Sequence, residues 1–439
     1  MTVAETGLRT TKVDEELLGS DTSIYYPVSV GSIIRGDEGE IFEAVRKIGW
    51  GVNSTVWVGR DCSDKAYYHS TSFQWVLGLT LLIRFSCPKY VALKILNKYA
   101  AREHDESSGR KTSELKILLR TYVGKEPDHR PQKLLYDEQG LVGPPHPGWF
   151  RVSGCLGAFP CENSQHFVIV FPLYGENMKE FMCGEPNERL AAPLTKRVAK
   201  DTLLALDYLH SYCGIIHCDV KPENILVDFD IGKDVDDLFE AIMKKEPNAG
   251  RQGHAASLWL PHHILENPRF VLSDFSHASW KDLIERSPVT LGSAALRAPE
   301  LIWGFAYGTP IDIWAFGCTI FELLTGKPLF RFPDSRSPNE LGEEPRYHLN
   351  LMQALAGEPY FPAAREGTPM IGKDFIDSDG WIKSPTGGNT LNELVSRDVP
   401  DDAEDKDKFE AFLRRCLKLD PRQRASASEL LNDPWLADD

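Results

Sequence analysis

The chain lacks a long apolar run and a cluster of cysteines. Its most apolar run, "FQWVLGLTLLIRF" at residues 73–85, is far shorter than the roughly 20 residues that span a bilayer, so we expect no transmembrane helix. The nine cysteines are odd in number, scattered, and include no C-x-x-C pair. This pattern indicates the reduced thiols of a cytosolic or nuclear protein rather than a disulfide framework.

An excess of positive charge and an apolar leader are also missing. The net charge is −15, from 64 acidic and 49 basic residues, which disfavours nucleic acid and anionic membranes as partners and favours basic proteins. Charges run through the first 23 residues, so we expect no signal peptide. His262 and His263 are adjacent, but no cysteine or acid lies at ligand spacing, which favours surface histidines over a metal site.

The length of 439 residues allows two lobes. Residues 1–24 are polar and predict a flexible leader. Strand-like patterns and one helical stretch predict a strand-rich N-terminal lobe over residues 25–177, whereas helical periodicity predicts a helical C-terminal lobe over residues 178–437. Within that lobe, residues 228–268 have the composition of a loop and predict a spacer insert.

Two glycines one residue apart, in "GWGVNSTVWVG" from Gly49 to Gly59, open a strand pattern. Glycine within a strand usually marks a close approach of the backbone to another group. A hairpin tip without side chains could offer backbone N–H groups to phosphates, but an ordinary tight turn would give the same short pattern.

Charged and polar residues also lie inside several apolar segments. Lys94 in "YVALKIL" needs a counter-charge or a cleft unless it is an edge lysine, and Glu114 in the next helix is its natural partner. In the loop "IIHCDVKPENILV", polar residues lie between two apolar runs, which indicates a function. These residues are His217, Asp219, Lys221 and Asn224. Further along the chain, a predicted strand runs into Asp274 in "FVLSDFSHASW", and Glu300 lies in "LRAPELIWG".

In this order the motifs resemble the signature set of eukaryotic protein kinases, from about residue 34 to residue 435. The resemblance implies an α+β, bilobal kinase fold with an ATP cleft between the lobes, and phosphoryl transfer from ATP with Mg²⁺. Lys94, oriented by Glu114, would hold the α- and β-phosphates. Asp219 would accept the proton of the substrate hydroxyl, and Lys221 would steady the γ-phosphate.

The resemblance also assigns metal, nucleotide and structural positions. Asn224 and Asp274 would bind Mg²⁺. Phe171 would lie behind the adenine, which the backbone of Pro172 and Tyr174 would hydrogen-bond. The implied ATP-binding positions are Gly49, Gly51, Ser54, Val56, Ala92, Lys94, Phe171, Pro172 and Tyr174. The implied structural positions are Glu300, paired with Arg424, and Asp312, which would brace the catalytic loop.

Among kinases, the chain most resembles the SR-protein kinase family. The shared features are "YYPVSVGSII", the Gly-Trp-Gly loop followed by Ser-Thr-Val-Trp, the His-x-Asp-Val-Lys-Pro-Glu-Asn loop, and a spacer before Asp274. The resemblance implies a monomer of the cytoplasm and nucleus that phosphorylates serines in arginine/serine-rich splicing factors, docked on an acidic surface.

Several positions depart from the family pattern. Ser276 replaces a glycine whose backbone can flip, Cys218 replaces the arginine of many kinases, Ser54 replaces the third loop glycine, and residues 295–297 read Ala-Leu-Arg rather than Gln-Tyr-Arg. A pseudokinase scaffold and a Clk-like or dual-specificity-like kinase are therefore the alternatives. The retained lysine, aspartates and asparagine favour an active enzyme. Residues 66–88 are either an added element or a retained intron of the gene model.

Overall fold

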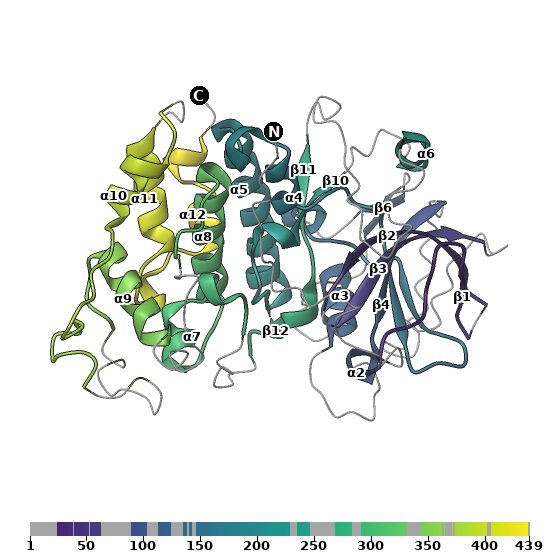
Figure 1. Cartoon of the computed structure of the whole chain (residues 1–439), viewed down its shortest axis with the longest axis horizontal. Coiled ribbons are helices and arrows are strands. Elements are labelled where there is room, and N and C mark those ends of the chain that lie inside the picture. Colours follow the sequence, from purple (N-terminus) through teal and green to yellow (C-terminus); the bar gives the residue numbers. More distant parts are fainter. Residues whose placement is uncertain are drawn as a thin grey trace, which may run out of the picture. The chain divides into compact units, whose positions relative to one another are not determined.

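The computed structural model describes residues 24–37, 39–51, 53–62, 89–102, 113–123, 135–137, 140–142, 146–228, 235–245, 268–282, 291–331, 344–361, 364, 371, 374–401 and 405–437. The chain divides into two compact units (Figure 1). The first unit draws on residues 1–115, 154–174 and 231–260, and the second on residues 116–153, 175–230 and 261–439.

The first unit is strand-rich. Six of its described strands form one antiparallel sheet in the order β1-β2-β3-β4-β8-β7. The strands are β1 (Ile33–Arg35), β2 (Ile41–Trp50), β3 (Ser54–Asp61), β4 (Tyr90–Leu96), β7 (Gly157–Pro160) and β8 (Phe167–Phe171). Two helices follow β4 along the chain: α2 (Lys98–Ala101) and α3 (Glu114–Val123).

Alternation along the strands gives this sheet two different faces. Val91, Leu93 and Ile95 of β4 lie in a hydrophobic core cluster, together with side chains of β1, β2, β3, β7 and β8. Successive side chains of a strand point to opposite sides, so Ala92 and Lys94 lie on the other face. The apolar cluster therefore fixes which face of β4 carries the lysine.

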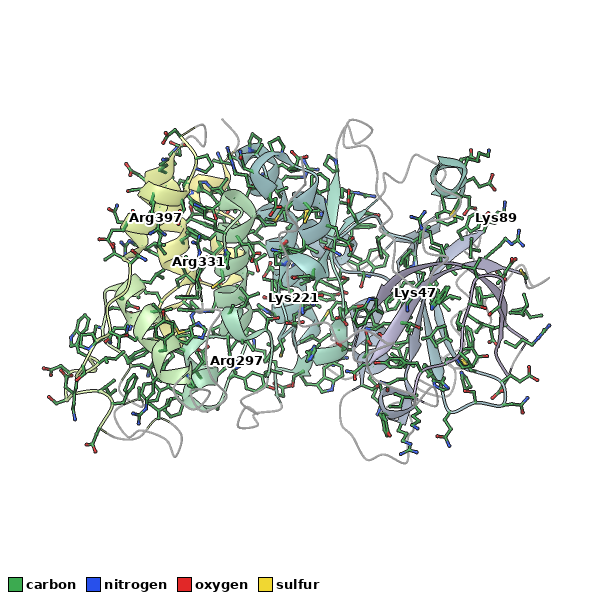
Figure 2. All side chains as sticks on the ribbon, in the orientation of Figure 1. Lys47, Lys89, Lys221, Arg297, Arg331 and Arg397 are labelled. Carbon is green, nitrogen blue, oxygen red and sulfur yellow. The ribbon has the colours of Figure 1, made fainter. Side chains whose placement is uncertain are left out.

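Helix α6 (Val235–Lys245) also belongs to the strand-rich unit. Its Asp236 carboxylate accepts hydrogen bonds from the backbone N–H groups of Lys89 (2.9 Å) and Tyr90 (3.0 Å), where β4 begins. Phe239 is buried with its ring centroid 4.6 Å from that of Tyr90. Lys89, labelled in Figure 2, pairs with Glu240.

The spacer was predicted as a loop of the C-terminal lobe, and this prediction was wrong for residues 235–245. Apolar residues recur there at helical spacing in "VDDLFEAIM", and burial of Phe239 places the helix in the strand-rich unit. The predicted lobe boundary also differs, because residues 116–153 group with the helical unit. For example, Arg151 of this segment forms a 2.7 Å ion pair with Asp201 of the helical unit.

We expect Asp236→Ala to lower the free energy of unfolding by about 1–3 kcal/mol, because it leaves two backbone N–H groups without their acceptor. Urea unfolding followed by circular dichroism measures the change. Asp237→Ala is the matched control, since Asp237 is the exposed neighbour on the same helix. Equal unfolding midpoints for the two variants would show that the contact of α6 with β4 contributes nothing.

The second unit is mostly helical. Its helices are α4 (Met178–Cys183), α5 (Ala192–Asp207), α7 (Pro299–Trp303), α8 (Pro310–Thr325), α9 (Glu344–Ala356), α10 (Leu391–Asp398), α11 (Lys406–Cys416) and α12 (Ala427–Leu430). Its short strands pair as β5 (Leu135–Asp137) with β6 (Gly140–Val142), β9 (Ile215–Ile216) with β12 (Ser279–Trp280), and β10 (Ile225–Asp228) with β11 (Arg269–Leu272). Helix α8 is buried along nearly its whole length and ends at Gly326 with φ +70°, as its apolar sequence predicts.

Three sequence predictions lie outside the described residues: the leader up to residue 23, the insert at residues 66–88, and the histidines at 262 and 263. Among the helices of the described ranges, none has the length and hydropathy needed to cross a membrane.

Candidate active site

The glycine hairpin connects β2 to β3 in the strand-rich unit. Gly49 lies opposite Val56 in the register, and the Gly51 N–H donates to the Ser54 carbonyl across 2.8 Å. A Cβ atom at Gly51 would meet nothing within 4 Å, and one at Gly49 would meet only Val56, at 3.4 Å. At these two glycines the backbone carries no side chain and has open space beside it, which fits a group that needs N–H donors at close range.

Lys94 lies on β4 opposite Val56 and Ile169. Its Nζ is 2.7 Å from Oε1 of Glu114 at the start of α3, and both side chains are largely buried. The predicted pairing of Lys94 with Glu114 is confirmed. A buried lysine held by a carboxylate has its ammonium group fixed in one place, as a phosphate contact requires.

Two of the predicted adenine positions, Ala92 and Phe171, lie on the same face of the sheet as Lys94. Ala92 of β4 lies opposite Phe171 of β8, and directly opposed residues share a face. Pro172 follows β8 and is half-buried, as is Tyr174. The hydroxyl of Tyr174 accepts a hydrogen bond from the Gly154 N–H (3.0 Å), which fixes the chain after β8.

In the helical unit, the loop after β9 is held by one buried carboxylate. Asp312 of α8 accepts hydrogen bonds from the backbone N–H groups of His217 (2.7 Å) and Cys218 (2.8 Å). Its Oδ2 also accepts from Nε2 of His210 at 2.8 Å. The prediction that Asp312 braces this loop is confirmed.

His217 links the loop to the segment after β11. Its Nε2 lies 3.0 Å from the Ser273 carbonyl, while its Nδ1 accepts from the Asp219 N–H at 3.3 Å. Complete burial lowers the pKa of His217, so the ring is neutral and its Nε2 carries the proton. The ring of Phe275 packs edge-on against it, 5.2 Å between centroids.

The Asp219 carboxylate is the most heavily bonded group of the loop. Its Oδ2 accepts from Nζ of Lys221 (2.5 Å) and from Nδ2 of Asn224 (3.1 Å). Its Oδ1 accepts from Oγ of Ser293 at 3.2 Å. Three donors from three directions fix the orientation of this buried carboxylate.

The predicted metal ligands Asn224 and Asp274 are linked by Ser273, which immediately precedes Asp274. The backbone N–H and the hydroxyl of Ser273 donate to the Asn224 carbonyl at 2.8 and 3.0 Å. Asp274 is half-buried and has φ +63°. Within the described part of the chain, Oδ1 of Asn224 makes no hydrogen bond, while its amide N–H group binds Asp219. An amide oxygen and a carboxylate are ligands that suit Mg²⁺.

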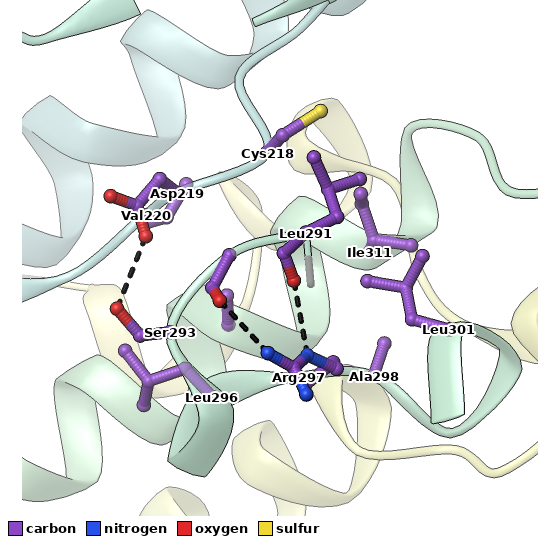
Figure 3. Close-up of a pocket in the computed structure, with 12 residues that line it drawn as sticks. Cys218, Asp219, Val220, Leu291, Ser293, Leu296, Arg297, Ala298, Leu301 and Ile311 are labelled. Carbon is purple, nitrogen blue, oxygen red and sulfur yellow. Dashed lines mark hydrogen bonds between the residues drawn. The ribbon is translucent and has the colours of Figure 1, made fainter. Parts of the chain in front are cut away.

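A hollow lies beside Asp219, under residues 291–298 (Figure 3). The Arg297 guanidinium donates to the carbonyls of Leu291 (3.1 Å) and Gly292 (3.2 Å) and so shapes this segment. Gly292 has φ +69°, and a Cβ atom there would lie 2.8 Å from the Cys218 carbonyl. Glycine is therefore required where the segment passes the loop after β9.

Two of the departures from the family pattern take conformations that their side chains tolerate here. Ser276 is exposed in a 3-10 turn, and its φ is not positive, so this conformation does not need glycine. Cys218 has φ +68° and is buried, and its backbone is held by Asp312. Burial raises its thiol pKa well above the usual value, which leaves the group protonated and unreactive.

Glu300 and Arg424 form the predicted structural pair. The guanidinium Nη1 and Nη2 atoms lie 2.8 and 2.9 Å from the two carboxylate oxygens, and both side chains are almost fully buried. The pair joins α7 to the segment that precedes α12, and Arg424 also donates to the carbonyls of Pro310 and Lys418.

Sequence reasoning missed two residues beside Asp219. Ser293 donates to its carboxylate, and Nδ1 of His277 lies 3.9 Å from its Oδ2. Ser293 precedes "LRAPE" and belongs to no motif of the sequence analysis, whereas His277 lies within "FVLSDFSHASW" but was assigned no role there. A single hydroxyl or imidazole in a loop carries no spacing pattern that would identify it.

Known proteins match this arrangement. The family model described as "Protein kinase domain" matches residues 158–436. A Physarum polycephalum protein named serine/threonine-protein kinase SRPK is 27% identical and covers 94% of this chain and 89% of its own length. Protein kinase dsk1 of Schizosaccharomyces pombe is 23% identical over 94% of this chain and 83% of its own length. The rat dual specificity tyrosine-phosphorylation-regulated kinase 3 is 28% identical over 66% of this chain and 44% of its own length.

The fold has a solved counterpart. The crystal structure of a kinase domain matches with a TM-score of 0.59 at 18% identity, covering 94% of this chain and 99% of that one. This similarity confirms the predicted bilobal kinase fold, and the family match extends over more than half of the chain. The chain therefore belongs to the protein kinase domain family.

Proposed function

We propose that this chain is an active serine/threonine kinase that transfers the γ-phosphate of ATP to serines in arginine/serine-rich proteins of mRNA splicing, in the cytoplasm and nucleus. The observation that carries the catalytic part is the Asp219 carboxylate, oriented by Lys221, Asn224 and Ser293. A carboxylate held in one orientation can accept a hydroxyl proton in line with phosphoryl transfer.

The chain retains the groups that the chemistry needs. Lys94, held by Glu114, would contact phosphates, and Asn224 with Asp274 would hold Mg²⁺. When bound, Mg²⁺ neutralises charge on the phosphate oxygens. Lys221 lies 2.5 Å from Asp219 and is partly exposed, so its ammonium group can serve both the carboxylate and a phosphate. These retained groups support an active enzyme over a pseudokinase scaffold.

The substrate class is supported by charge and by similarity. The net charge of −15 favours arginine-rich partners, and the resemblance of the glycine and catalytic loops to SR-protein kinases points to the same class. The Physarum polycephalum relative, which aligns with nearly the whole chain, is named serine/threonine-protein kinase SRPK.

The test is a phosphorylation assay with labelled ATP and Mg²⁺ on three peptides: an Arg-Ser repeat, a Lys-Ser repeat of equal charge, and an Arg-Tyr repeat. We expect transfer to the Arg-Ser peptide above the other two, with phosphoserine as the product. Equal rates with the Arg-Ser and Lys-Ser peptides would show that the enzyme recognises positive charge and not arginine itself. No transfer to any peptide would contradict the active-enzyme proposal.

The same assay at increasing NaCl tests electrostatic docking. Exposed charges are screened over about 10 Å at 0.1 M salt, so the KM for the Arg-Ser peptide should rise steeply between low and physiological salt. The KM for ATP should change less, because Lys94 and Glu114 are buried. Parallel rises of the two KM values would argue against an acidic docking surface.

A further inference from the structure

The segment before β1 is attached to the strand-rich unit at several points. The Ile24 carbonyl accepts hydrogen bonds from the Lys98 N–H (3.1 Å) and from Nε2 of His166 (3.0 Å). The Tyr26 ring lies edge-on to His166, 5.4 Å between centroids. Tyr26 and Val28 pack against the hydrophobic core cluster. We call residues 24–28 the N-terminal strap.

The strap also reaches the glycine hairpin. The Tyr25 hydroxyl donates to the Gly51 carbonyl across 3.2 Å. On the other side of the tip, the Asn97 N–H donates to the Asn53 carbonyl across 2.8 Å. Asn97 immediately precedes Lys98, to which the strap is bonded. The two anchors of the hairpin tip are thus themselves connected through the strap.

Gly51 is held through its backbone, by the Tyr25 hydroxyl at its carbonyl and by the Ser54 carbonyl at its N–H. Gly51 has no side chain, and even a Cβ atom there would touch nothing within 4 Å, so packing does not fix this part of the tip. The hydrogen bond from Tyr25 to the Gly51 carbonyl therefore restricts the movement of this part of the hairpin. Backbone N–H groups of this hairpin are the donors that a phosphate would use.

We propose that Tyr25 is a positioning residue for the nucleotide loop. Its hydroxyl holds the Gly51 carbonyl and thereby keeps the hairpin between β2 and β3 in position for phosphate binding. The proposal rests on the proposed function, since it takes the hairpin between β2 and β3 as the part that contacts ATP. It adds to the nucleotide site a residue of "YYPVSVGSII", a stretch to which the sequence analysis assigns no role in nucleotide binding.

The matched pair of variants is Tyr25→Phe and Tyr26→Phe. Both keep a ring in the strap and remove one hydroxyl. The Tyr26 hydroxyl makes no hydrogen bond within the residues that the structure describes, whereas that of Tyr25 binds Gly51. Titration calorimetry with the non-hydrolysable analogue of ATP and Mg²⁺ measures binding without catalysis.

We expect Tyr25→Phe to raise the Kd for the nucleotide about threefold to tenfold, the usual effect of one hydrogen bond. Tyr26→Phe should bind like the wild type, and the KM for the Arg-Ser peptide should be the same in all three proteins. If the Kd of Tyr25→Phe equals that of the wild type, the proposal for Tyr25 is overturned and the proposed function is unaffected. Absence of nucleotide binding in the wild type would instead overturn the proposed function, and the role of Tyr25 with it.

Hydrogen exchange separates positioning from a general loss of stability. In Tyr25→Phe without nucleotide, exchange should accelerate at the amides of residues 51–55 and stay unchanged in β4 and β8. Faster exchange throughout the sheet would show that Tyr25 is merely structural and would overturn the proposal, even if nucleotide binding weakened.

Discussion

Replacement of Asp219 by asparagine is expected to lower kcat by a factor on the order of 10² or more, as loss of a positioned base does. The amide cannot take up the hydroxyl proton that the carboxylate accepts. Asparagine keeps the size of the side chain and one carbonyl oxygen, which can still accept the hydrogen bond from Lys221, while its NH2 group can donate to the Ser293 hydroxyl. Nucleotide affinity should therefore change little, and initial rates with the Arg-Ser peptide at saturating ATP give the measurement.

Asp379→Asn is the matched control for this variant. It makes the same chemical change at an exposed carboxylate of the helical unit, and its kcat should equal that of the wild type. An Asp219→Asn protein that turns over as fast as the control would show that Asp219 is not the base. A loss of nucleotide binding equal to the loss of kcat would show that Asp219 acts in binding.

Arg424→Gln is expected to lower the free energy of unfolding by about 3–5 kcal/mol, because it leaves the buried Glu300 carboxylate without its counter-charge. The Arg424 side chain is 0% exposed and that of Glu300 2%, so water cannot replace the lost donors. The same change removes hydrogen bonds to the carbonyls of Pro310 and Lys418. Chemical denaturation of the purified protein gives the value.

Arg422→Gln is the control, two residues away. Arg422 also pairs with a carboxylate, that of Asp420, but its side chain is 74% exposed, and such surface pairs contribute about 0–1 kcal/mol. The two arginines thus differ in burial and share their chemistry. If both variants unfold at the same denaturant concentration, the buried pair does not stabilise the helical unit.

Three contacts could be predicted from the sequence because each involves a charge within an apolar segment. Lys94 lies in "YVALKIL" and Asp312 in "IDIWAFG", and a buried charge requires a partner. Motif order then supplied the partner: Glu114 for Lys94, and the catalytic loop for Asp312. The pairing of Glu300 with Arg424 followed in the same way from the order of the kinase motifs.

The contacts that escaped prediction involve neutral groups or backbone. Ser293 and Tyr25 each contribute one hydroxyl from a loop, and neither has a spacing that marks it. Helix α6 does carry a helical pattern of apolar residues, but its polar flanks dominate the composition of the spacer. Its attachment to β4 depends on Asp236 meeting two backbone N–H groups, and such a contact leaves no trace in side-chain patterns.

The attachment of α6 to β4 also sets the order in which the strand-rich unit can be completed during synthesis. Asp236 and its partner Tyr90 are 146 residues apart. At about 5–20 residues per second, the ribosome delivers α6 on the order of ten seconds after β4. Throughout that interval the two N–H groups at the start of β4 and the ring of Tyr90 lack the partners that α6 later supplies, so the strand-rich unit is completed only after α6 has been made.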